Sequence, residues 1–473
     1  MTDRRTSAVT KPIPPIDLSW LLMESPAGTT HVGAMLLFQK PPGGASVVRE
    51  IVEAYRAYPP VAPFNYVPEL LVGGAPHFRE VAAWDAHHHV QHLSLPADAA
   101  YEDLLRLVAD LHEPALDRDR PLFRCWVIDG VPGDMFALYT KIHHSIMDGA
   151  SGMRSLYAGL STSDERKVLP PGFALGVPAS PPHPPTSVAR RIADSIHAAV
   201  TQVGAINQVS IGALRKTVAG LAGSHLDGSL PFIANRAPTN EPLAVGRRFA
   251  TLSLPLDEMH EIARRSGATL NDVAVTLVDA GLHAYLREGG RAFAHPFIAM
   301  CPVSLRAEDD ATVGTRVSAM FVRLGEPTAS VPERFRQVVK SIGACKKELR
   351  AMSTEAAFTY AIGLVALAGL AATTHLDRLA RPACNLTISN VPGAAEPRYL
   401  NGARLVDIYP VSALAASIGL NATLTSYHDR MDFGFVANAA AFDDLPELAR
   451  HTHQAYLELK DAAAQPPAGR SAV

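Results

Sequence analysis

The chain has 473 residues, a formal net charge of -3 and 48% hydrophobic residues. It is longer than one ordinary hydrophobic core requires, so we expect two domains. A charge this close to zero provides no basic surface for nucleic acid, and we expect no nucleic-acid partner. The four cysteines are scattered without metal-ligand spacing and no signal peptide is visible. These features indicate a reducing, cytoplasmic location.

The first third of the sequence alternates between predicted helices and strands. Hydrophobic periodicity and Pro or capping residues predict a helix over 16–24, a strand over 30–38, and helices over 47–58 and 101–113. Between the last two helices lie four histidines, namely His87, His88, His89 and His92. No Cys or carboxylate completes a recognisable metal-ligand set with them, so we interpret residues 84–93 as a surface strand.

Two short apolar runs then predict a β-hairpin. Residues 124–128 and 136–139 have strand character, and a turn signal at Asp129-Gly130 separates them. The second run leads into His143-His144-Ser145-Ile146-Met147-Asp148-Gly149, after which residues 150–160 predict a helix. The Asp-Gly turn can bend a carboxylate back toward the two imidazoles at the strand end.

These residues by themselves support more than one interpretation. A neutral imidazole can take a proton from an alcohol near neutral pH. No Gly-x-Ser-x-Gly nucleophile elbow is present, so such a base would act directly on a substrate hydroxyl. The acyl donor would then have to be activated already, as a thioester is. A structural His pair, or half of a metal site, explains the same residues equally well.

A Pro-rich segment separates two halves of similar character. Residues 166–244 contain Pro-Pro pairs and an amphipathic helical pattern over 188–206. We interpret this segment as a linker whose helix packs across a domain seam or lies on a membrane surface. We therefore predict an N-terminal domain over 1–165 and a C-terminal domain over 245–473.

The second half again alternates between strands and helices. Strands are predicted over 249–254, 297–306, 384–393, 405–409, 420–427 and 431–436, and helices over 256–266 and 445–463. Another helix is expected to begin near residue 270, with Asn271 or Asp272 at its N-terminus. The uncharged stretch 356–376 is rich in Ala, Gly and Thr, so a buried helix is favoured over a membrane span.

The sequence resembles the bacterial wax ester synthase/acyl-CoA:diacylglycerol acyltransferase family over nearly its whole length. Residues 143–149 match the HHxxxDG motif of that family, and residues 269–273 resemble its ND block. The other matching blocks are His31-Val32-Gly33, Pro121-Leu122-Phe123, Pro302-Val303-Ser304-Leu305-Arg306 and Ser389-Asn390-Val391-Pro392-Gly393. HHxxxDG also occurs in condensation domains and other CoA-dependent acyltransferases, but the blocks together favour the narrower family.

The resemblance implies an α+β fold of two similar domains, like chloramphenicol acetyltransferase, with a tunnel at the domain interface. It implies transfer of a long-chain acyl group from acyl-CoA to diacylglycerol, to a fatty alcohol, or to both. Acyl-CoA would be a co-substrate, and no metal or other cofactor is expected. Contact with the inner face of the cell membrane or with a lipid droplet is compatible with these substrates.

The resemblance also assigns expected roles to individual residues. His144 is the expected general base, acting without an acyl-enzyme, and His143 supports the loop or contacts substrate. Asp148 is expected to brace the loop. Gly149, Asn271 and Asp272 either contribute to substrate binding or are structural, helix capping being the simple explanation for the last two. Alternatives are a condensation-type enzyme with a carrier-bound donor, a non-catalytic lipid-binding member, and a His/Asp metallohydrolase.

Overall fold

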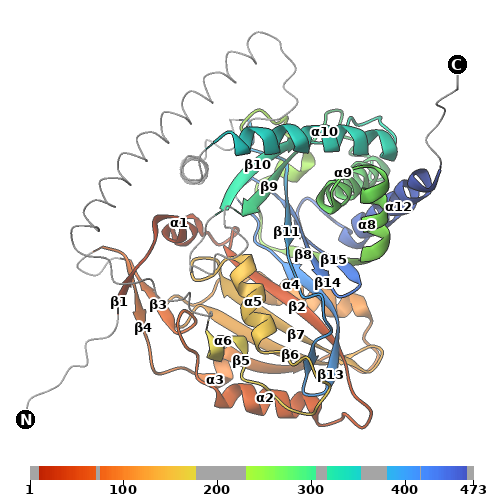
Figure 1. Cartoon of the computed structure of the whole chain (residues 1–473). Coiled ribbons are helices and arrows are strands. Elements are labelled where there is room, and N and C mark those ends of the chain that lie inside the picture. The colour runs from red at the N-terminus through yellow and green to blue at the C-terminus, as the bar shows by residue number, and fades with distance from the viewer. Residues whose placement is uncertain are drawn as a thin grey trace, which may run out of the picture.

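The structure is a computed structural model that describes residues 10–70, 75–176, 231–304, 317–352, 381–415 and 417–465. The predicted amphipathic helix over 188–206 and the uncharged stretch over 356–376 lie outside the described residues. Both halves of the chain contain strands and helices, so the predicted α+β class is confirmed (Figure 1). Most of these strands form two six-stranded sheets, one consisting mainly of first-half strands and the other of second-half strands.

The first sheet is organised around the hairpin that precedes the HHxxxDG motif. Its strands β6 (Phe123–Val131) and β7 (Met135–His143) pair antiparallel. The turn was predicted at Asp129-Gly130, which is wrong, because both residues lie within β6 where the register shifts between Ile128 and Val131. Strand β2 (His31–Gln39) pairs with the other edge of β7.

The outer strands of this sheet come from distant parts of the chain. The order is β12-β13-β2-β7-β6-β5, with β5 (Val90–Ser94) at one edge. At the other edge, β12 (Tyr399–Leu400) and β13 (Ala403–Val411) come from the second half, and β13 pairs antiparallel with β2. The sheets therefore do not divide the chain strictly by sequence, and the domain limits at 165 and 245 stay a prediction.

Side chains on the first sheet alternate between two apolar layers, as strand geometry requires. One face, with Leu36 and Leu138, packs in the same cluster as α2 (Val47–Ala57) and α5 (Gly149–Ala158). The opposite face, with Met35 and Tyr139, packs against α4 (Tyr101–His112) and residues of the second half. Short helix α6 (Gly172–Leu175) adds Phe173 to the first layer.

The segment that leads into this sheet contains a second correction. Residues 84–93 were predicted to be a surface strand, but Ala86–His89 forms the short helix α3 before β5 begins. The Asp85 carboxylate caps α3 by accepting from the backbone N–H groups of His87 and His88. His89 is buried and its Nδ1 lies 2.8 Å from the Phe123 carbonyl oxygen. A small sheet of β1 (Thr10–Pro12), β4 (His77–Glu80) and β3 (Tyr66–Glu69) precedes it.

The second sheet carries its helices on one outer side (Figure 1). Its strands, in the order β10-β9-β11-β14-β15-β8, are β10 (Val317–Arg323), β9 (Ile298–Ser304), β11 (Leu386–Val391), β14 (Leu420–Tyr427), β15 (Arg430–Asn438) and β8 (Arg247–Pro255). The helices are α8 (Leu256–Arg265), α9 (Leu270–Glu288), α10 (Val331–Arg350) and α12 (Leu445–Ala464). They bury their apolar faces in one large core with this sheet.

The two sheets meet where β13 crosses β15. The Asp432 carboxylate on β15 accepts from the Ile408 backbone N–H on β13 at 2.9 Å and from the Ser253 hydroxyl at 2.5 Å. Gly434 packs so closely on the Pro410 carbonyl oxygen that a side chain at this position would collide with it. This contact holds β13, the second-half strand of the first sheet, against β15 of the second sheet.

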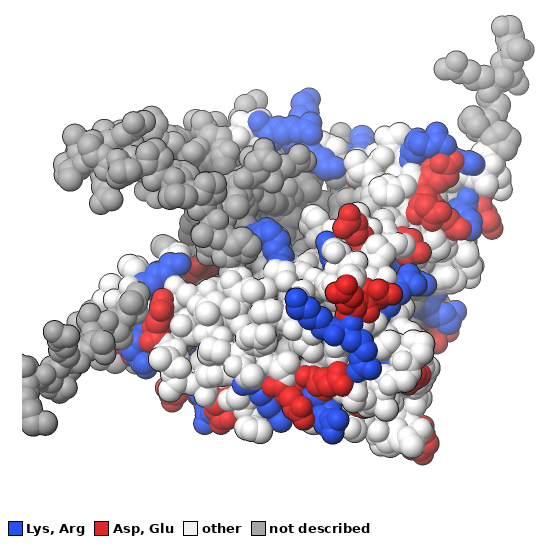
Figure 2. Space-filling view, turned by 60° about the horizontal axis from the view of Figure 1, so that its bottom comes forward, with Lys and Arg blue, Asp and Glu red and all other residues white. Residues whose placement is uncertain are grey.

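The described surface bears interleaved charges. Figure 2 shows Lys and Arg side chains beside Asp and Glu side chains on the face in view, with a broad area free of charge between them. Within the described part of the chain, no helix has both the length and the apolar character needed to cross a membrane.

Candidate active site

The HHxxxDG loop joins the last residue of β7 to the first residue of α5. His143 ends the strand, and the helix begins at Gly149. Asp148 is the N-cap of α5, and its Oδ1 accepts from the Ser151 backbone N–H at 2.8 Å. A side-chain oxygen at this position satisfies a helix donor that has no partner within the helix. The structure therefore places the carboxylate where it braces the loop.

His143 is completely buried and held at both ring nitrogens. Its Nδ1 accepts from the Ser145 backbone N–H at 3.1 Å, and its Nε2 lies 3.1 Å from the Thr30 hydroxyl. That hydroxyl donates to the Trp20 carbonyl oxygen, so it accepts from His143. These partners assign the neutral tautomer with its proton on Nε2. The ring fixes the loop and has no nitrogen left for chemistry.

Glu24, which directly follows the N-terminal helix α1 (Pro15–Met23), supplies a buried carboxylate that supports His143. Glu24 Oε1 lies 3.7 Å from His143 Nε2, and Glu24 Oε2 pairs with Arg118 at 2.9 Å. Burial acts to raise the pKa of Glu24, but His143 and Arg118 together outweigh burial and lower the pKa. Glu24 is therefore an anion at neutral pH and holds three segments of the first half together.

His144 differs from its neighbour in being left free for chemistry. Its backbone N–H donates to the Thr30 carbonyl oxygen at 3.0 Å, which fixes the backbone. Its Nδ1 is buried and has no hydrogen-bond partner among the described residues. Its Nε2 is not one of the buried atoms without a partner, and it forms no hydrogen bond to a described residue. Burial lowers the pKa of His144, and the Asp148 charge acts in the opposite sense more weakly. The ring is thus neutral at pH 7 and can accept a proton at Nε2.

The loop lies at the seam between the two halves. A Cβ atom at Gly149 would come within 3.5 Å of Val391 on β11, so the start of α5 touches the second-half strand that carries the SNVPG residues. Further along the same helix, eight residues after Gly149, Tyr157 stacks with Tyr427 on β14 at a ring-centroid separation of 6.5 Å. The HHxxxDG loop of the first half therefore borders on side chains of the second half.

Asn271 and Asp272 occupy the first turn of α9. The Asp272 carboxylate accepts from the Thr269 backbone N–H at 2.7 Å, and Thr269 in turn accepts from the Asp272 backbone. This is a capping box, the structural alternative considered for these residues. Neither residue is hydrogen-bonded to His143 or His144 among the described contacts. The other Asp272 oxygen is buried without a partner.

Several supporting residues escaped the sequence analysis. Trp20, Glu24 and Thr30 contact the two histidines from more than a hundred positions away in the chain. Beneath them, Lys141 is buried and donates to the carbonyl oxygens of Leu111 and Pro114, and burial lowers its pKa to about 7. The sequence places Trp20, Glu24 and Thr30 close to the His31-Val32-Gly33 block. That proximity in the chain does not reveal that they contact the two histidines.

A cavity of about 30 Å³ lies behind the loop, between the first sheet and helices α2, α5 and α6. Two buried hydroxyls without partners, of Thr140 and Ser155, are among its otherwise mostly apolar lining. All of its lining residues belong to the first half. It is therefore distinct from the predicted tunnel at the domain interface, which stays a prediction.

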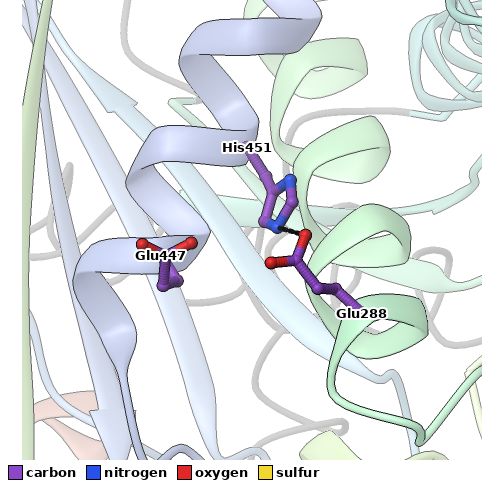
Figure 3. Close-up of side chains that lie close together, drawn as sticks. All are labelled: Glu288, Glu447 and His451. Carbon is purple, nitrogen blue, oxygen red and sulfur yellow. Dashed lines mark ion pairs between the residues drawn. The ribbon is translucent and has the colours of Figure 1, made fainter.

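One group of described residues lies close enough together to hold a metal ion, namely Glu288, Glu447 and His451 on α9 and α12 (Figure 3). His451 is turned toward Glu288, with 3.0 Å between Nε2 and Oε2. The Arg450 guanidinium pairs with both carboxylates, at 2.6 Å to Glu447 and 3.4 Å to Glu288. The Arg450 guanidinium therefore already neutralises part of the negative charge of these two carboxylates. The group lies on α9 and α12, which do not form the HHxxxDG loop.

With this geometry established, comparisons identify the class of protein. Residues 13–274 match the wax ester synthase/diacylglycerol acyltransferase catalytic domain, and residues 313–460 match the WS/DGAT C-terminal domain. The chain is 31% identical to the O-acyltransferase WSD of Acinetobacter baylyi over 94% of its own length and 96% of that protein. It is also 31% identical to a probable diacylglycerol O-acyltransferase of Mycobacterium tuberculosis, over 95% of this chain and 97% of the relative.

The chain belongs to the wax ester synthase/diacylglycerol acyltransferase family. Among solved structures, a wax ester synthase/diacylglycerol acyltransferase from Marinobacter aquaeolei VT8 matches with a TM-score of 0.74 and 27% identity, covering 96% of this chain and all of that one. A condensation domain of the calcium-dependent antibiotic synthetase shares the fold, with a TM-score of 0.59 at 17% identity and 98% coverage of each chain. The predicted family and fold class are confirmed.

Proposed function

We propose that this protein is an O-acyltransferase that moves a long-chain acyl group from acyl-CoA to diacylglycerol, to a long-chain fatty alcohol, or to both. The observation that carries the mechanism is the contrast between the two motif histidines. His143 is consumed by structural hydrogen bonds, while His144 presents a free Nε2 and is neutral at pH 7. The names of the relatives support the reaction class, and the acceptor remains the point to test.

In the proposed reaction, His144 Nε2 takes the proton of the acceptor hydroxyl as its oxygen attacks the thioester carbonyl carbon. The new C–O bond forms, the C–S bond breaks, and the imidazolium returns the proton to the CoA thiolate. No acyl-enzyme is required and no cofactor takes part. Base catalysis of this kind contributes about 10²–10⁴-fold, and the rest must come from positioning and exclusion of water.

The other motif residues act by holding the base in place. His143 and Asp148 anchor the two ends of the loop through Thr30, Ser145 and Ser151. For Asn271 and Asp272 we propose a structural role at the start of α9, because the capping box already employs the Asp272 carboxylate. Contact with the membrane or with a lipid droplet is part of the proposal, since both acceptors are lipids.

The test is an assay with radiolabelled palmitoyl-CoA and three parallel acceptor conditions: hexadecanol, diacylglycerol and none. The wild type should form wax ester, triacylglycerol or both, and His144→Ala should reduce turnover by at least about 10²-fold while the protein stays folded. Free CoA without any ester would indicate a thioesterase. Wild-type turnover by folded His144→Ala would refute the base assignment.

A further inference from the structure

The indole of Trp20 lies flat against the imidazole of His144. The two ring centroids are 4.1 Å apart and the ring planes differ by 15°. Trp20 is on helix α1, which enters the first half before β2, so the contact joins two elements that are distant in the chain. In a stack of this kind each ring covers a face of the other, while the ring nitrogens lie at the edges, which the partner ring does not cover.

The position of this indole is fixed by its own backbone. The Trp20 carbonyl oxygen accepts from the Thr30 hydroxyl at 3.0 Å, the same hydroxyl that holds His143. The carbonyl oxygen of the next residue, Leu21, accepts from Arg118 at 2.6 Å, and the Leu21 side chain is 1% exposed. The indole is therefore attached to the same framework as the catalytic loop.

The indole N–H is the unexplained feature. Trp20 Nε1 is buried and has no hydrogen-bond partner among the described residues. A buried donor without an acceptor is costly, and native proteins satisfy nearly all such groups. Trp126, by contrast, donates from its Nε1 to Gln91 at 2.9 Å. An acceptor atom on a bound substrate would give the Trp20 N–H the hydrogen-bond partner that it lacks.

We propose that the Trp20 indole N–H donates a hydrogen bond to a substrate oxygen bound beside His144. The inference rests on the proposed function, because it places a substrate at His144. The N–H lies in the indole plane and therefore points alongside the imidazole, not into it. An indole N–H only donates, so the oxygen must be an acceptor, either on the acceptor alcohol or on the thioester carbonyl.

Both oxygens are suitable acceptors, because each becomes more negative during the proposed reaction. The alcohol oxygen loses its proton to His144, and the carbonyl oxygen gains negative charge while the tetrahedral intermediate exists. A donor aimed at either one becomes a stronger partner as that charge develops. No proton passes to or from Trp20, which acts as a fixed donor throughout.

The primary variant is Trp20→Phe, which keeps an aromatic face against His144 and removes the N–H. Incorporation of benzothienylalanine at the same position keeps the bicyclic shape and also removes only the N–H. We expect both to lower kcat/KM about tenfold, the usual effect of one lost hydrogen bond. The matched control is Trp84→Phe. Trp84 also lies beside a histidine, with 5.9 Å between its ring centroid and that of His89, but in another part of the fold.

The kinetic constants identify the oxygen. A raised KM for the acceptor with kcat preserved indicates the alcohol oxygen in the ground state, and a lowered kcat indicates the oxyanion. The pH dependence should stay unchanged in Trp20→Phe, since the imidazole keeps its covering ring. Wild-type kcat/KM in both N–H-deficient variants, with His144→Ala inactive, would overturn the inference and leave the proposed function standing. Wild-type activity of His144→Ala would overturn the proposed function itself.

Discussion

The backbone N–H of Ser145 donates to Nδ1 of His143 at 3.1 Å and thereby fixes where that ring carries its proton. The proton on Nε2 then faces Thr30 and Glu24. Two adjacent histidines with the same chemistry are thus made unequal by one short backbone contact. His143 belongs to the framework of the loop, and only His144 keeps a nitrogen available to a substrate.

Exchanging each histidine for alanine should separate stability from activity. His143→Ala removes the partners of Thr30 and Ser145 in a fully buried place, so we expect a loss of about 1–3 kcal/mol in the free energy of unfolding. His144→Ala removes a ring without side-chain hydrogen bonds to described residues and should cost less. Urea denaturation of both variants measures this difference. Equal losses would contradict the division of roles.

The pH dependence of kcat/KM should reflect the lowered pKa of His144. A base works in its neutral form, so activity falls as the pH drops through its pKa, and this acidic limb should lie below pH 6.5. Asp148→Asn keeps an oxygen for the helix cap but removes the charge that raises the pKa. The limb should therefore move to still lower pH in that variant. A limb above pH 7 in the wild type would contradict the burial argument.

Glu24→Gln should lower stability in a pH-dependent manner. The pKa of Glu24 is lower in the folded state than in the unfolded chain, so its contribution is present above the unfolded value and is lost as the pH falls through the folded value. We expect Gln to cost about 1–3 kcal/mol at pH 7, because the Glu24 side chain is only 6% exposed. The difference from wild type should shrink as the pH falls below 4.5 and through the lowered pKa of folded Glu24, measured by urea denaturation at each pH.

Glycine substitutions test the junction between the sheets. Gly434→Ala would drive a methyl group into the Pro410 carbonyl oxygen, and we expect a loss of about 3 kcal/mol or more, or failure to fold. The matched control is Gly343→Ala on helix α10, where the new methyl group meets no described atom within 4 Å outside the adjacent helix backbone. That change should stabilise by about 0.5–1 kcal/mol. Thermal unfolding of the two variants gives the comparison directly.

The sequence was sufficient for the local parts of this fold. The strand-and-motif order around the HHxxxDG loop, the Asp148 position after the histidines, and the helices starting near residues 101, 270 and 445 all follow from periodicity and capping residues. The short helix α3 (Ala86–His89) was missed, because a helix of four residues shows no helical periodicity. Local patterns of this kind depend on neighbours in sequence.

The supports of the site depend on neighbours in space. Nothing in the residues around Trp20 or Glu24 indicates that they touch a motif more than a hundred positions later. The placement of β13 beside β2 was equally hidden, because an alternating apolar strand fits many partners and only the assembled fold selects one. The motif blocks shared with the family mark individual stretches of the sequence, but they do not indicate which of these stretches are in contact in the folded chain.

The insertion of β13 into the first sheet also constrains how the chain is made. Strand β2 emerges from the ribosome early, while its partner spans residues 403–411. At the ~5–20 residues per second of protein synthesis, β2 has one unpaired edge for tens of seconds. That edge is apolar over Ala34 to Phe38 and is prone to pair with other nascent chains. A chain truncated before residue 403 should therefore yield an aggregating product, because the β2 edge then never gains its partner.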